Sequence, residues 1–195
     1  MDKDKYCKQM ANFYAYNFYL EKIPLDMYVD ETLGVKCAVM RSSDNPDEVA
    51  IVSLDRPFFR EEEPPVQVIL FASKKLLEDK ENARVLKEFH HELMEYVYED
   101  YFNGSIEYPG MFTPNDEFVK RFNKVAYSLQ ICNGGDPVFI EMDSEEEDCV
   151  AYVVSPMFLN EEQFDQYNKL LLVDEDEASN YIFDLDEEEN ISLLK

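Results

Sequence analysis

The stretch that decides the fold is VKCAVMR at residues 35–41, followed by the turn-forming run SSDNPD at 42–47 and a second β-type run, VAIVSL, at 49–54. Both β-type runs are rich in β-branched and apolar residues, and Ser, Asp, Asn and Pro favour turns between strands. The pattern therefore predicts an antiparallel hairpin. A third run at residues 66–72 is apolar on both faces, which indicates a central strand.

Amphipathic patterns around this hairpin predict four main helices. Apolar side chains recur at helical spacing over about residues 3–21 and again over about residues 81–102. A third helix is expected over about residues 113–131, because a good capping residue is followed by proline at the first helical position. The fourth is expected after Asn160, with Gln163 completing a capping box.

A second hairpin is expected from residues 137–142 and 149–154, joined by a turn at 143–148 that is almost entirely acidic. Each of the two hairpins follows an aromatic amphipathic helix, and their strand sequences are similar. The predicted fold class is therefore α+β, with antiparallel hairpins, about four helices and an internal pseudo-repeat of an αββ unit. Chance similarity is the alternative to the repeat, since hairpins share composition.

The predicted domain organisation is a single α+β domain at residues 1–172, with pseudo-repeat halves at about 1–102 and 113–172, and an acidic C-terminal tail at 173–195. The chain has 43 Asp and Glu against 18 Lys and Arg, a net charge of -25. From residue 141 onward there are 18 acids and 2 bases, so a charge of -16 lies on the last 55 residues. Such a field repels nucleic acid and anionic membrane and attracts basic partners.

The sequence favours a reduced, cytoplasmic protein. It shows neither a signal-peptide pattern nor an apolar run long enough to span a bilayer. The four cysteines are far apart, without the C-x-x-C spacing of zinc or redox sites, and are expected to be mostly buried thiols.

One motif points to enzyme chemistry. The sequence FHHELME at residues 89–95 resembles the zincin metallopeptidase helix, H-E-x-x-H, in which two histidines one turn apart bind zinc and the glutamate activates water. This resemblance implies a degenerate or unusual metallopeptidase with zinc on His91 and Glu95. Glu95, however, stands where the second histidine belongs, and the only other histidine, His90, points about 100° away on a helix.

The preferred interpretation is a non-enzymatic acidic interaction protein with no catalytic residues and no cofactor. Its partner would be a basic protein surface that normally binds nucleic acid. The chain would inhibit or shield that surface as a nucleic-acid mimic, and it would bind neither nucleic acid nor membrane itself. The expected contacts are carboxylates on the 81–102 helix, on the acidic turn and in the tail. Those on the helix and the turn are Glu81, Glu88, Glu92, Glu95, Glu99, Asp143, Glu145, Glu146, Glu147 and Asp148.

Two further interpretations stay open beside the peptidase. The order of expected elements resembles that of type III secretion chaperones, apart from the extra helix at about 113–131, and this implies a small acidic chaperone or adaptor, for which a homodimer is an expected form. Alternatively, the acidic surface serves solubility alone.

Overall fold

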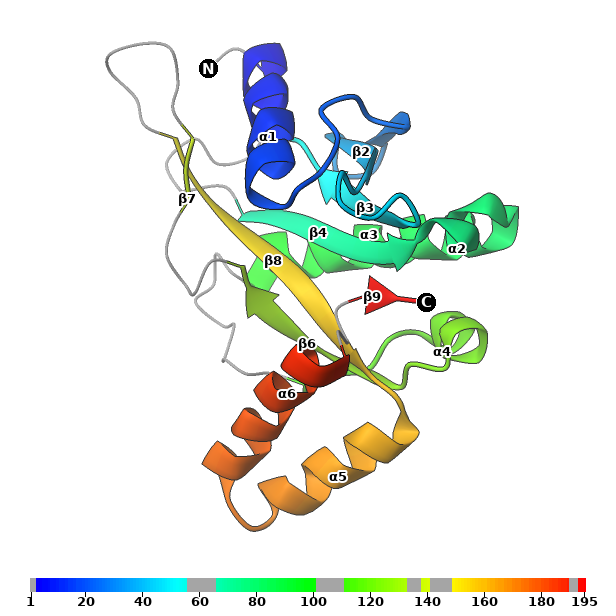
Figure 1. Ribbon diagram of the computed structural model, residues 1–195, viewed down its shortest axis with the longest axis vertical. Coiled ribbons are helices and arrows are strands. Elements are labelled where there is room, and N and C mark those ends of the chain that lie inside the picture. The colour runs from blue at the N-terminus through cyan, green and yellow to red at the C-terminus, as the bar shows by residue number, and fades with distance from the viewer. Residues whose placement is uncertain (1–2, 56–65, 101–110, 133–137, 141–148, 190–192) are drawn as a thin grey trace.

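The computed structural model describes residues 3–55, 66–100, 111–132, 138–140, 149–189 and 193–195. Its centre is a nine-stranded sheet with the order β1-β2-β3-β4-β8-β6-β5, in which β7 also pairs with β8 and β9 with β4 (Figure 1). The strands are β1 (Asp26–Asp30), β2 (Val35–Arg41), β3 (Glu48–Ser53), β4 (Val66–Ser73), β5 (Met111–Phe112), β6 (Ala126–Ile131), β7 (Val138–Ile140), β8 (Cys149–Leu159) and β9 (Leu193–Leu194).

Helices cover both faces of this sheet. The described helices are α1 (Lys3–Asn17), α2 (Lys74–Glu78), α3 (Lys80–Asp100), α4 (Asp116–Phe122), α5 (Glu161–Leu171) and α6 (Glu175–Glu189). Alternation along β8 assigns the faces, because successive side chains of a strand point to opposite sides. Val154 and Phe158 join the core beneath α3 and α4, whereas Val153 faces α1 and Met157 and Leu159 face α5 and α6. In Figure 1, α1 and the α5–α6 pair lie at opposite ends of the molecule.

Strand β8 connects the two parts of the sheet. Its residues 152–154 pair parallel with residues 66–68 of β4, and its residues 154–159 pair antiparallel with β6. The sequence indicated that β4 is central, and in the structure β4 has β3 on one side and β8 and β9 on the other. The mixed α and β content confirms the coarse fold class, and the two expected hairpin pairings, β2 with β3 and β7 with β8, are both antiparallel.

The predicted helix over residues 113–131 is wrong in its second half. α4 ends at Phe122, because Asn123 takes a left-handed conformation with φ 53° and closes the helix, and β6 follows at once. The N-cap is Asn115, whose side chain accepts a hydrogen bond from the Phe118 N–H, and not Thr113. The pseudo-repeat is not confirmed: β1 pairs with β2, whereas β6 pairs with β8 instead of β7, and six helices are described instead of four.

Two other segments add to the expected elements. The first helix ends at Asn17, Leu20 bridges Ser42, and β1 pairs with β2 after bends at residues 22–23 and 25. The segment expected as an acidic tail contains α6 and β9, and β9 pairs parallel with residues 71–72 of β4. Leu194 is 1% exposed within the core beneath α3.

The described cysteines Cys7, Cys37 and Cys132 are thiols, and the first two are buried. Burial raises the pKa of Cys37 to about 12. Among the described residues there is no helix with the length and apolar character needed to cross a bilayer.

Candidate functional site

The carboxylates predicted on the 81–102 helix do lie on α3, but they do not form a row of free negative charges. Glu81, Glu88, Glu92 and Glu95 are exposed, whereas the side chain of Glu99 lies outside the described residues. Arg84 lies between the first two: its guanidinium is 3.2 Å from Glu81 Oε2 and 2.6 Å from Glu88 Oε2, and it also bonds Glu117 of α4. Two of the predicted contact carboxylates, Glu81 and Glu88, are thus already paired with a cation of their own helix.

Two more of these predicted residues have contacts of their own. Asn115 donates a hydrogen bond to Glu92 Oε1 at 2.8 Å, which links the N-terminus of α4 to α3. Glu95 Oε2 is 4.0 Å from His91 Nε2. The acidic turn at residues 143–148, with Asp143, Glu145, Glu146, Glu147 and Asp148, lies outside the described residues.

The two histidines of the zincin-like motif face different surroundings. His91 Nδ1 is 2.7 Å from Asp30 Oδ2 of β1, so the ring nitrogen is held by the edge of the sheet. His90 is fully buried, and its Nε2 is 3.2 Å from the Val68 carbonyl oxygen. Within the ranges that the structure describes, no three His, Cys, Asp or Glu side chains converge to hold a metal ion. The zinc alternative on His91 and Glu95 stays a prediction.

Among the described residues, an acidic surface without ion pairs lies on the helical hairpin at residues 160–185, which comprises α5, its turn and the described side chains of α6. α5 begins with the predicted capping box: Asn160 Oδ1 accepts from the Gln163 N–H, and Gln163 Oε1 accepts from the Asn160 N–H, both at 2.9 Å. Asp174 caps α6, because its Oδ1 accepts from the Asp176 N–H at 2.9 Å. The helical hairpin is anchored by an apolar cluster that includes Tyr167, Ala178 and Ile182.

Eight exposed carboxylates lie on this helical hairpin, against the single base Lys169. None of the eight forms an ion pair with another described residue, in contrast to Glu81 and Glu88 on α3. Those in the first turns also stabilise their helices, because the positive end of the helix dipole lies there. The eight are Glu161, Glu162, Asp165, Asp174, Glu175, Asp176, Glu177 and Asp184. Burial raises the pKa of Tyr167 between the helices, and the Glu175 carboxylate adds to the rise.

An apolar tip interrupts this acidic surface at the turn between α5 and α6. Leu171, Leu172 and Val173 form the tip, and Leu172 and Val173 are 89% and 81% exposed. The turn is held by its backbone, since the Val173 and Asp174 N–H groups both donate to the Leu170 carbonyl at 2.8 Å. The backbone of the tip is therefore held in place, and its three apolar side chains have carboxylates beside them.

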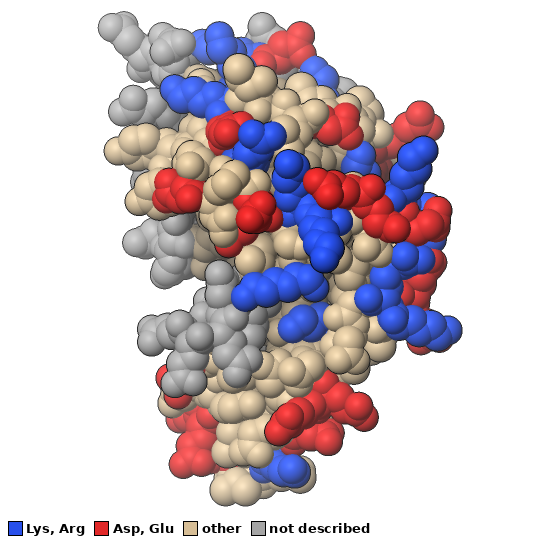
Figure 2. Space-filling model, turned by 45° about the vertical axis from the view of Figure 1, so that its right-hand side comes forward, with Lys and Arg blue, Asp and Glu red and all other residues tan. Residues whose placement is uncertain are grey.

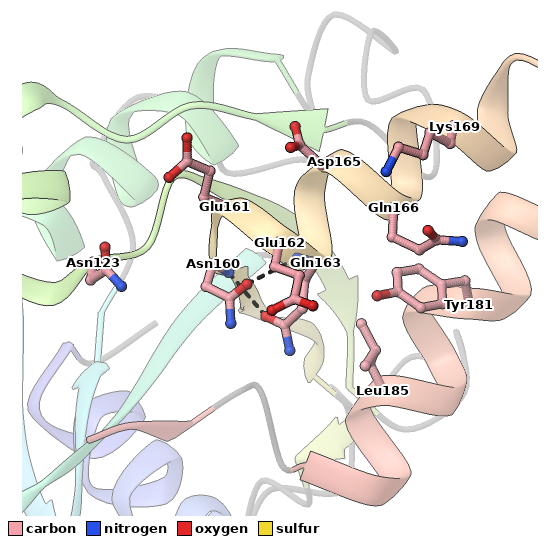
Figure 3. Close-up of a pocket in the computed structure, with 10 residues that line it drawn as sticks. All are labelled: Asn123, Asn160, Glu161, Glu162, Gln163, Asp165, Gln166, Lys169, Tyr181 and Leu185. Carbon is pink, nitrogen blue, oxygen red and sulfur yellow. Dashed lines mark hydrogen bonds between the residues drawn. The ribbon is translucent and has the colours of Figure 1, made fainter.

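A groove of about 720 Å³ runs along the same helical hairpin. Gln166 of α5 and Tyr181 of α6 lie between the two helices, with Leu185 of α6 next to Tyr181 and the Asn160–Gln163 capping box at the start of α5 (Figure 3). Lys169 also lines the groove. The groove is lined mainly by amides and carboxylates, with Tyr181 and Leu185 as its apolar part. Such a lining can accept hydrogen bonds from cationic or amide groups.

Acidic groups dominate one end of the visible face of the molecule. Figure 2 shows Lys and Arg across the middle of that face with acids interspersed among them, and mostly acids at the lower end. Comparison with protein-family models, with curated proteins and with solved structures finds no match. Functional inference consequently rests on the geometry of the chain itself.

Sequence reasoning predicted α5 but missed α6, the second helix of this helical hairpin, although a signal for it was present. Ala178, Tyr181, Ile182 and Leu185 recur at the spacing of one helical face, directly after an Asp that can act as an N-cap. The many acids between these apolar residues are typical of a solvated tail, and they obscure the helical periodicity.

Proposed function

We propose that this chain is an acidic interaction protein that binds a basic, nucleic-acid-binding protein surface through its helical hairpin and shields that surface from nucleic acid. The observation that carries the proposal is the group of eight exposed carboxylates at residues 160–185, which no described cation neutralises. The lysine and arginine side chains of the partner that normally bind nucleic-acid phosphates would bind these carboxylates instead. The α3 residues Glu92 and Glu95 and the acidic turn at 143–148 are proposed as outer contacts.

The apolar tip supports binding over mere solubility. An exposed ion pair contributes only about 0–1 kcal/mol, so a charged surface by itself binds weakly and with little selectivity. Burying a Leu or Val side chain contributes roughly 1.5–3 kcal/mol, which makes Leu172 and Val173 the expected anchors. The partner should therefore present an apolar recess flanked by Lys and Arg. A surface selected for solubility alone would not need two such residues exposed among acids.

The test measures binding of the full chain to a purified lysine-rich histone, used as a basic DNA-binding probe, with labelled duplex DNA as the competitor. We expect the wild-type chain to displace the DNA, and its affinity to fall at least about tenfold between about 50 mM and about 500 mM NaCl. A Leu172→Ser/Val173→Ser variant keeps every charge and should lose most of the competition, because the anchor is removed.

A matched pair of charge variants locates the contact. Asp165→Asn/Asp184→Asn removes two charges from the helical hairpin, and Asp44→Asn/Asp47→Asn removes two from the exposed β2–β3 connection. Only the first pair should weaken competition. Equal losses from both pairs, together with full activity of the Leu172→Ser/Val173→Ser variant, would mean that the protein acts by net charge alone, and the proposal would fail.

A further inference from the structure

Four exposed apolar side chains lie on β1 and on the segment just before it, at the edge of the sheet. Met27 and Val29 alternate in β1 and point to one face, with exposed fractions of 56% and 54%, and Ile23 and Leu25 precede the strand with exposed fractions of 79% and 45%. This set is called the edge row. β1 pairs with β2 on one side, and among the described residues no strand pairs with its other side. An edge strand of this kind is a template for pairing with another strand.

The opposite side of β1 is firmly held by α3. Asp26 Oδ2 is 2.9 Å from Lys87 Nζ, the same ammonium lies 4.4 Å from the centre of the Tyr28 ring, and Asp30 binds His91. These contacts fix the orientation of the strand, so the edge row is presented on the face away from α3. They also give the edge acids positively charged or imidazole partners. The edge is therefore a locally balanced part of a chain whose net charge is -25.

Local charge balance argues against a basic partner at this edge and favours a second copy of the chain. Two antiparallel registers place a two-fold axis on this strand. An axis at Tyr28 would set Asp26 opposite Asp30 of the second copy, and like charges directly opposite each other destabilise a sheet. An axis at Met27 sets Leu25 opposite Val29 and Met27 opposite Met27 of the second copy. In that register Asp26 faces Tyr28 of the second copy, and no acid is opposed by an acid.

We propose that two copies of the chain pair antiparallel through β1, about a two-fold axis at Met27, so that their sheets become continuous. The proposal concerns a surface separate from the helical hairpin and does not depend on its function. The self-complementary edge row supplies apolar cross-strand pairs, and an isologous contact of this kind closes as a dimer. Because each copy carries -25, added salt should strengthen the dimer by screening repulsion. Salt should have the opposite effect on the binding of a basic protein.

Cysteine cross-linking tests the register directly. Met27→Cys should form a disulfide with itself under mild oxidation, because the two positions lie opposite each other at the axis. Leu25→Cys should not cross-link with itself, since the two copies of residue 25 would be about 13 Å apart, beyond the reach of a disulfide. Leu25→Cys and Val29→Cys should cross-link when they are mixed. The wild-type chain, with its own thiols, measures the background.

Sedimentation at several protein and NaCl concentrations gives the second measurement. We expect a wild-type dimer that strengthens with salt and whose dissociation constant rises roughly tenfold or more in Met27→Lys. Leu172→Lys makes the same change at the exposed apolar tip and should leave the dimer unchanged; circular dichroism confirms folding of both variants. A wild-type chain that stays monomeric to about 1 mM, a dimer indifferent to Met27→Lys, or cross-links of equal yield in all cysteine variants would overturn the proposal.

Discussion

Buried His90 makes a quantitative prediction about stability and pH. Its ring is fully buried between α3 and the sheet, and Nε2–H donates to the Val68 carbonyl at 3.2 Å, while Nδ1 has no hydrogen-bond partner among the described residues. Burial lowers the pKa of His90 to about 4, from an ordinary value near 6.5; the hydrogen bond to Val68 and the Asp30 carboxylate oppose the change, and His91 adds to it. The imidazole is therefore neutral in the folded protein at pH 7.

The pKa difference determines how much stability depends on pH. Between pH 6.5 and about 4 the unfolded chain binds a proton at this site that the folded chain does not, so the free energy of unfolding falls as pH falls. The full difference corresponds to roughly 3 kcal/mol, of which about 2 kcal/mol is lost by pH 5. Measurement can stop there, above the isoelectric point near 4.2, where proteins tend to associate.

The assay compares urea unfolding of the wild type and His90→Gln between pH 7.5 and pH 5. Glutamine can donate to the Val68 carbonyl but does not titrate, and every other ionisable group is common to both proteins. The wild type should lose about 2 kcal/mol relative to the variant over this range. If the difference between the two unfolding free energies does not change with pH, His90 is not held neutral by burial and the reasoning is refuted.

Three further stability predictions test the rest of the architecture. Asp174→Ala removes the N-cap of α6 and should cost about 1 kcal/mol, measured by thermal unfolding, whereas an effect near zero would show that the cap is not needed. Leu194→Ala should cost about 2–5 kcal/mol in urea unfolding, because β9 buries this side chain against the sheet, while Lys195→Ala is the neutral control. Phe89→Ala should lower the free energy of unfolding by about 3–5 kcal/mol, since the centres of the Phe89 and Phe118 rings are 4.2 Å apart in the core. A loss below about 1 kcal/mol would contradict this packing.

Local patterns predicted the elements whose side chains repeat within one segment. The strands at residues 35–41, 49–54 and 66–72, and the capping box at Asn160 and Gln163, are present in the structure with bounds that differ by at most a residue. Each of these signals depends on neighbouring residues, as alternation and capping do. The prediction of one helix through residues 118–129 was wrong, because their apolar residues fit both the helical period and the strand period. Only the left-handed turn at Asn123 separates α4 from β6.

At the candidate site, too, the sequence predicted one part and the packing decided another. Composition identified the acidic C-terminal part as the charged end of the chain, but it did not show which carboxylates have cationic partners. Arg84 reaches Glu81 and Glu88 along α3 and Glu117 across to α4, so the predicted stripe is partly neutralised, while the acids of the helical hairpin are not. Neutralisation by a residue on another helix depends on how the two helices pack.

The sequence by itself determined where most strands and helices form and that the C-terminal part is acidic, because side-chain periodicity and net charge are properties of the local chain. Only the tertiary structure decided that β8 joins β4 to β6, that β9 returns to β4, and that β1 remains at the edge with its apolar row exposed. The physical reason is that strands pair through backbone N–H and C=O groups, which nearly every residue carries alike. Pairing partners distant in the chain are consequently chosen by how the whole set of apolar faces packs together.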